Sequence, residues 1–161
     1  MSSGISVIAG LGNPGDKYAR TKHNAGFLLL DALAAKLDCR QWKLWGDCAY
    51  ARASLAGGEL YLLKPLAYMN NSGPVIGAFL EYFKFPPQSL LVCFDDISMD
   101  IGKIRIRKSG SSGGHQRMES VIRRLGTKDI SRLKLGTGPQ PQGQDSLHLV
   151  LLKFSRAEKE V

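Results

Sequence analysis

Two side chains, His23 and Asp95, have the types and local settings that proton-transfer chemistry requires. His23 lies in a polar loop just before a predicted helix, and a histidine can take or give a proton near neutral pH. Asp95 follows the apolar run 89–94, where a carboxylate can orient a histidine or hold a metal ion. Beyond the adjacent Asp96, no further acid or histidine stands nearby in metal-binding register, so we expect no metal. A surface histidine and a solvent-facing acid are the ordinary alternatives.

Two amide side chains, those of Asn13 and Asn70, could also take part in a reaction. Asn13 stands in the turn Gly12-Asn13-Pro14-Gly15, which would present it at the carboxyl end of a strand. Asn70 precedes a predicted helix, and amides can orient a carbonyl or stabilise an oxyanion. No GxSxG motif is present, and no cysteine has a general base beside it in sequence. Water is therefore the expected nucleophile.

The stretch from Gly10 to Gly15 fits the GxGxxG pattern of dinucleotide-binding proteins, but its context does not. That motif opens a helix at once, and an acid ends the next strand about 20 residues later. Here the polar segment 16–23 intervenes, and Asp31, the acid at that distance, lies inside the predicted helix. We therefore expect neither a nucleotide nor any other cofactor.

The positive charge of the chain is concentrated in one window. The chain has a net charge of +8, and the segment from Lys103 to Lys134, with ten basic and two acidic residues, accounts for all of it. Such a patch predicts a polyanionic partner, nucleic acid first, although a merely solvated basic face is the alternative.

The remaining composition is that of a cytoplasmic globular protein. No apolar run is long enough to cross a membrane, and the amino terminus lacks the pattern of a signal peptide. The three cysteines are scattered, so we expect reduced thiols rather than disulfides or a zinc site.

The elements that must position these residues alternate between strands and helices. Helices are predicted over 25–37, with Asn24 as cap, over 72–84, with Ser72 as cap, and over about 115–125. Strands are predicted over 5–10, 48–55, 59–64, 89–94, 131–137 and 147–153, and the alternating segment 102–108 places Lys103, Arg105 and Arg107 on one face. Gly57-Gly58 indicates a hairpin. The expected fold is a single α/β domain over 1–161, with a mixed sheet and helices on both faces.

Six segments of the chain resemble the bacterial-type peptidyl-tRNA hydrolase family, in order and in register from about Ser6 to Phe154. They are Ala9–Gly15, Thr21–Phe27, Lys64–Gly73, Val92–Asp96, Gly102–Arg105 and Gly113–His115.

The resemblance implies a monomer that hydrolyses the ester between a peptide and the 3′ end of a tRNA, without a metal. His23 would be the general base, oriented by Asp95. The substrate would be positioned and the cleft lined by Asn13, Tyr18, Tyr68, Met69, Asn70, His115 and Gln116. Arg107 and Lys134, both within the basic window, would hold the 5′ phosphate of the tRNA.

The chain departs from the family pattern around the third helix. Gln116 and Arg117 stand where the family has asparagine and glycine, which would move a substrate-binding amide and add bulk and charge beside the cleft. Gly138-Pro-Gln-Pro141 replaces a common Gly-Arg-Pro, and the C-terminal helical segment usual in the family is expected to be missing. The alternative function is therefore an RNA-binding homologue with weakened catalysis.

Overall fold

The computed structural model describes residues 4–12, 24–55, 57–66 and 71–138. They form a mixed sheet with three helices and one short 3-10 turn. The elements, in chain order, are β1 (Val7–Gly10), α1 (Ala25–Lys36), β2 (Lys43–Trp45), β3 (Cys48–Leu55), β4 (Gly58–Pro65), α2 (Ser72–Phe83), η2 (Pro87–Ser89), β5 (Leu90–Asp100), β6 (Ile104–Arg107), α3 (Gln116–Leu125) and β7 (Ser131–Gly138).

The sheet has the strand order β2-β3-β4-β1-β5-β7-β6. Its four central strands, β4, β1, β5 and β7, run parallel to one another. The antiparallel pairs lie at the two sides of the sheet: β2 and β3 precede β4, and β6 pairs with β7. The hairpin predicted at Gly57-Gly58 joins β3 to β4, so the expected mixed sheet is confirmed.

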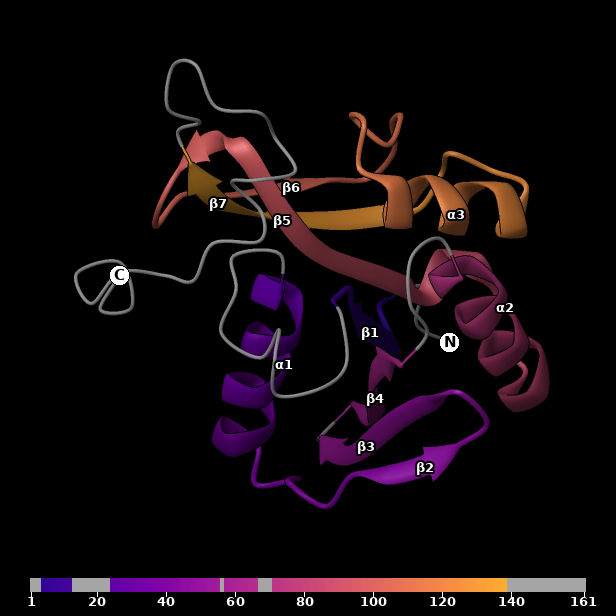
Figure 1. The fold of residues 1–161 in the computed structure, drawn as a ribbon. Coiled ribbons are helices and arrows are strands. Elements are labelled where there is room, and N and C mark those ends of the chain that lie inside the picture. Colours follow the sequence, from indigo (N-terminus) through magenta and orange to yellow (C-terminus); the bar gives the residue numbers. More distant parts are fainter. Residues whose placement is uncertain (1–3, 13–23, 56, 67–70, 139–161) are drawn as a thin grey trace.

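The helices cover both faces of this sheet, as the alternation of elements predicted (Figure 1). On one face, Leu30 and Ala34 of α1 pack against Leu62 and its neighbours in β3 and β4. On the other face, α2 and α3 cover the larger apolar cluster, in which Phe79 and Met118 are fully buried. Adjacent residues of β4, Leu62 and Leu63, enter opposite clusters, as the alternation of a strand requires.

Glycines allow α1 to lie directly on the backbone of the sheet. A Cβ atom added to Gly26 would lie 2.6 Å from the carbonyl oxygen of Cys93 and 2.7 Å from the backbone nitrogen of Leu11. Gly10, on β1, would meet the carbonyl oxygen of Gly26 at 2.5 Å. The first turn of α1 is therefore fixed against the carboxyl end of β1 and the middle of β5.

Several details differ from the sequence predictions. The short strand β2 was not predicted, and β5 continues beyond residue 94 to Asp100, so Asp95 lies within a strand rather than after it. Helix α2 is capped by Asn71, not Ser72, and neither Asn71 nor Asn24 makes a side-chain cap hydrogen bond to its helix. The strand predicted over 147–153 lies outside the described residues.

None of the helices in the described part of the chain is both long and apolar enough to span a membrane.

Candidate functional site

The order in which the strands are connected predicts a ligand-binding region beyond the carboxyl ends of β1 and β5. From β1 the chain passes through α1 to strands on one side, whereas from β5 it passes to β6 and β7 on the other side. Open α/β sheets bind ligands in the crevice that forms where neighbouring strands diverge in this way. β1 ends at Gly10, opposite Cys93, so Asp95 of β5 extends past the end of its neighbour into this region.

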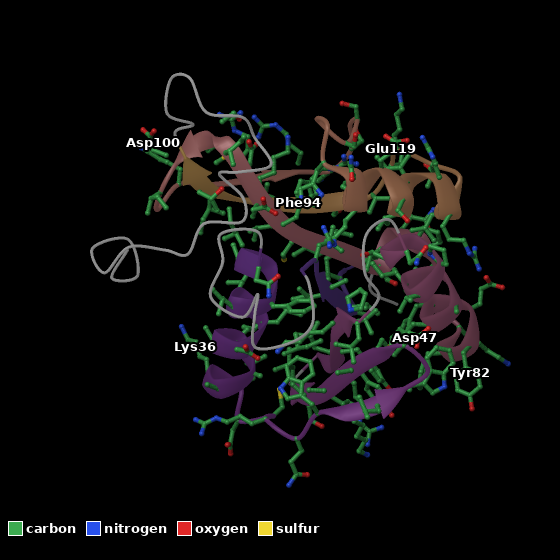
Figure 2. All side chains as sticks on the ribbon, in the orientation of Figure 1. Lys36, Asp47, Tyr82, Phe94, Asp100 and Glu119 are labelled. Carbon is green, nitrogen blue, oxygen red and sulfur yellow. The ribbon has the colours of Figure 1, made fainter. Side chains whose placement is uncertain are left out.

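Asp95 and His115 meet at this point. His115 Nε2 lies 2.9 Å from Asp95 Oδ1, and the two side chains are only 9% and 3% exposed. The imidazole also packs on the ring of Phe94, with 4.7 Å between the ring centroids. Figure 2 labels Phe94 on β5 and Glu119 on α3, the two elements that this contact joins.

The hydrogen bond at Nδ1 of His115 indicates which tautomer the ring adopts. His115 is the N-cap residue of α3, and the backbone N–H of Met118 donates to its Nδ1 at 3.3 Å. Nδ1 is therefore an acceptor without a proton, so the neutral ring carries its proton on Nε2 and donates it to Asp95.

The adjacent carboxylate, Asp96, has a different environment. Its Oδ1 accepts hydrogen bonds from the backbone nitrogen and the hydroxyl of Ser98, at 2.9 and 2.6 Å. Asp96 thus makes a local contact within β5, whereas Asp95 contacts the imidazole of His115. Within the described ranges, no three His, Cys, Asp or Glu side chains gather in a metal-binding group.

A row of cations lies beside this site on the last two strands. The antiparallel register pairs Arg105 with Lys134 and Arg107 with Arg132, so all four side chains share one face. Like charges directly opposite one another repel, and the ion pairs of the described residues include none of these four. An anionic partner would relieve this repulsion. Lys103, predicted on the same face, precedes β6.

A groove of about 560 Å³ lies along α3, beside the N-terminal end of α2. Its lining residues are Pro74, Ser112, Gly114, Gln116, Glu119, Ser120, Arg123 and Arg124. The two helices touch closely beneath it, since the backbone nitrogen of Gly73 donates to Ser120 Oγ at 2.9 Å. Gln116 is one of the residues on the wall of this groove. Arg117 is 8% exposed and is not among the lining residues.

The other predicted site residues, Asn13, Tyr18, His23, Tyr68, Met69 and Asn70, lie outside the described residues, so their roles stay predictions. Three of them directly adjoin described residues. Asn13 follows Gly12, His23 precedes the buried Asn24, and Asn70 precedes Asn71 at the start of α2. A Cβ atom on Gly12 would lie 2.7 Å from Asn24 Oδ1, so two of these positions are in contact.

The contact between His115 and Asp95 was missed by the sequence prediction, which assigned His115 to substrate binding. The available signal was its place after Gly113-Gly114 and before a helical segment, a typical setting for an N-cap residue. The capping role can be read from that setting, but the carboxylate partner, 20 residues earlier, cannot.

The cysteines of the chain are free thiols. Burial raises the pKa of the Cys48 thiol to about 11 and that of the Cys93 thiol to about 12. Burial and the charge of Asp38 also raise the pKa of Cys39. Because the thiolate is the nucleophilic form, none of the three is suited to attack a carbonyl near neutral pH.

The family model described as peptidyl-tRNA hydrolase matches residues 7–161. The chain is 45% identical over 159 residues to the peptidyl-tRNA hydrolase of Elusimicrobium minutum (strain Pei191), an alignment that covers 98% of this chain and 84% of that protein. It is 47% identical over 152 residues to the peptidyl-tRNA hydrolase of Thermotoga petrophila, covering 94% and 80% of the two chains.

The fold is similar to solved structures with the same name. The crystal structure of peptidyl-tRNA hydrolase from Acinetobacter baumannii superposes with a TM-score of 0.90 at 33% sequence identity, and the match covers 99% of this chain and 81% of that one.

Proposed function

This chain belongs to the peptidyl-tRNA hydrolase family, and from that membership we propose that it cleaves the ester bond between a peptide and the 3′ end of a tRNA, with water activated by His23 and His23 oriented by Asp95. The observation that carries the residue assignment is the position of Asp95. It is a buried carboxylate beyond the end of β1, at the place where this fold binds ligands.

The geometry around Asp95 supports a role for His23. The neighbouring residues of β5, Leu91 and Cys93, pair with Ile8 and Gly10, whose face of the sheet is covered by α1. By alternation, Asp95 belongs to that same face. In the sequence, His23 directly precedes Asn24, the N-cap residue of α1. The first turn of α1 lies on the backbone of Cys93, two residues before Asp95.

In the proposed reaction, the imidazole of His23 takes a proton from water as the water oxygen bonds to the ester carbonyl carbon. The bond from that carbon to the ribose oxygen then breaks, and the proton passes from the imidazolium to the leaving oxygen. Asp95 accepts a hydrogen bond from the other ring nitrogen and thereby fixes the tautomer of His23. A carboxylate has about four lone-pair sites, so Asp95 can serve His23 and His115 together.

The remaining assignments concern the substrate. Asn13 and Asn70 orient the peptide backbone and the scissile carbonyl, with Tyr18, Tyr68 and Met69 lining the cleft. Gln116 lies on the wall of the groove between α2 and α3, where it can contact the substrate.

The tRNA binds through its phosphates to the cations of β6 and β7, with Arg107 and Lys134 at the 5′ phosphate. Their support is that Arg105, Arg107 and Lys134 reach solvent on one face and form none of the ion pairs of the described residues. We further propose that the protein acts as a monomer in the cytoplasm. The RNA-binding alternative gains no support from the relatives and structures described above, which are named as hydrolases.

The test is hydrolysis of a peptidyl-tRNA by the unmodified protein and by His23→Ala. We expect release of the peptide by the unmodified protein and loss of that release in His23→Ala, with tRNA affinity retained. Substantial hydrolysis by His23→Ala would exclude His23 as the base, whereas tRNA binding without hydrolysis by the unmodified protein would favour the RNA-binding alternative.

A further inference from the structure

Arg132 of β7 is a buried cation that the proposed reaction does not use. Its side chain is 1% exposed, whereas the cations around it on β6 and β7 reach solvent. The ion pairs among the described residues do not include it, and burial lowers the pKa of its guanidinium. A charge held in the interior without a carboxylate needs other compensation.

Backbone carbonyl groups from two loops supply that compensation. Nη1 donates to the carbonyl oxygen of Ser111 at 2.7 Å, and Nη2 donates to those of Lys128 and Ile130 at 2.8 and 3.0 Å. Nε donates to Ile130 as well, at 3.1 Å. The guanidinium therefore joins the loop before α3 to the loop before β7. The backbone nitrogen of Gly110, which donates to Lys128 at 3.2 Å, joins the same two loops.

The loop that Arg132 holds is the one that carries His115. It contains three glycines with positive φ, Gly110 at 140°, Gly113 at 64° and Gly114 at 86°. Such a segment has high conformational freedom in the absence of an external constraint. From Ser111 the chain continues to Ser112, whose carbonyl oxygen accepts from the backbone nitrogen of His115 at 3.2 Å. The imidazole that contacts Asp95 follows directly from this fixed segment.

We propose that Arg132 is a positioning residue of the hydrolytic site: its guanidinium fixes the loop 109–114 and so holds the His115 imidazole against Asp95. This role rests on the proposed function and deepens it. Arg132 shares a strand face with Lys134, yet its burial prevents contact with a tRNA phosphate. Its effect is therefore on the rate of the reaction and not on tRNA binding.

The experiment compares Arg132→Lys, Arg132→Met and the control Arg52→Met in the full chain. Lysine keeps the charge but cannot reach three carbonyl groups at once, and methionine removes both charge and hydrogen bonds. Arg52 is an exposed arginine of β3, paired with Glu59 at 3.3 Å, so its replacement changes the net charge equally without touching the loop. The kinetic readouts are kcat and KM for a peptidyl-tRNA and the salt dependence of tRNA binding.

We expect kcat to fall by about 10- to 100-fold in both Arg132 variants, since a misplacement near 1 Å can cost about 100-fold. KM and the salt dependence should match those of Arg52→Met and of the unmodified protein. Rates within about threefold of the unmodified protein would overturn the proposal. A salt slope lowered by about one would also overturn it, because that is the signature of a phosphate contact.

Two further measurements do not depend on hydrolysis. In ¹⁵N NMR spectra, the His115 ring should be a single Nε2–H tautomer in the unmodified protein and a mixture of tautomers in Arg132→Lys. An unchanged ring would contradict the proposal.

In hydrogen exchange, the Gly110 and His115 amides of the unmodified protein should be protected, and rapid exchange there would overturn the proposal even if neither variant folds. If the unmodified protein fails to hydrolyse peptidyl-tRNA, the proposed function fails, while these two measurements still decide whether Arg132 fixes His115.

Discussion

The hydrogen bond of 2.9 Å between His115 and Asp95 connects the two faces of the sheet. His115 caps α3, which packs on one face, whereas the alternation of β5 assigns Asp95 to the face covered by α1. The two can meet because β1 ends at Gly10, so that no strand among the described residues lies beside Asp95 on that side. A residue that precedes α1 and a residue that precedes α3 can therefore share one carboxylate.

The His115 imidazole has two functions, the N-cap of α3 and the hydrogen bond to Asp95, and His115→Asn should remove only the second. Asparagine is a good N-cap residue, so the start of α3 should be kept, but its shorter side chain cannot donate to Asp95. We expect kcat for peptidyl-tRNA to fall by about tenfold or more, because Asp95 loses a group that fixes its orientation. Steady-state kinetics with the purified variant provide the measurement.

The matched variant is His115→Ala, which loses both contacts. It should have the same kinetic defect and, in addition, a free energy of unfolding lower by about 1 kcal/mol than that of His115→Asn, the usual worth of a cap. Full activity in His115→Asn would show that the contact with Asp95 has no part in the reaction.

The helices could be predicted from sequence to within about two residues, and the reasons are local. Pro86-Pro87 ends the pattern after α2, and Gly126, in a left-handed conformation, ends α3. The strand β2 could not be predicted, because three mostly exposed residues have no internal pattern and are ordered by pairing with β3. The extension of β5 to Asp100 likewise depends on β7, which lies more than 30 residues later.

The site could be predicted only as a set of residues. Motif spacing selected Asp95, His115 and Gln116 without showing which of them touch. The contact between His115 and Asp95 depends on where β1 ends relative to β5, which is a property of the folded sheet. Arg132 could be noticed in the sequence only as one more cation of the basic window, because its burial and its carbonyl partners arise from two loops that meet in space.

A further prediction concerns the exposed cations of the last two strands. Arg107→Ala and Lys134→Ala should each weaken tRNA binding and lower the dependence of log K on log salt concentration by about one, because each variant loses one phosphate contact. The measurement is a binding titration at several salt concentrations. Lys43→Ala, at the opposite edge of the sheet on exposed β2, is the control. Equal slopes for all three variants would mean that this face is only solvated.

Gln116→Asn should raise the turnover of peptidyl-tRNA by up to about 100-fold. Gln116 is the first residue of α3, is exposed, and lines the groove beside His115. Asparagine is one methylene shorter than glutamine, so its amide group should return to the position that it has in the family pattern. Positional errors near 1 Å have effects of this size on the rate. Single-turnover rates measure the change.

The control for this variant is Gln88→Asn, the same chemical change in η2 at the amino end of β5, which should leave the rate unchanged. A rate for Gln116→Asn equal to or below that of the unmodified protein would mean that the groove is adapted to glutamine.

The close approach of α2 and α3 predicts that Gly73→Ala is strongly destabilising. A Cβ atom at Gly73 would lie 2.0 Å from the carbonyl oxygen of Ser120, a backbone atom that cannot move unless the whole helix shifts. We expect a loss of about 1–3 kcal/mol or more in the free energy of unfolding, measured with urea, as for other overpacked sites.

The control is Gly57→Ala, where an added Cβ would meet nothing within 4 Å, and which should change the free energy of unfolding by less than about 1 kcal/mol. The groove between the two helices would open as α2 is displaced, so the activity of any folded Gly73→Ala should fall as well. Equal stability of the two alanine variants would contradict the tight packing of these helices.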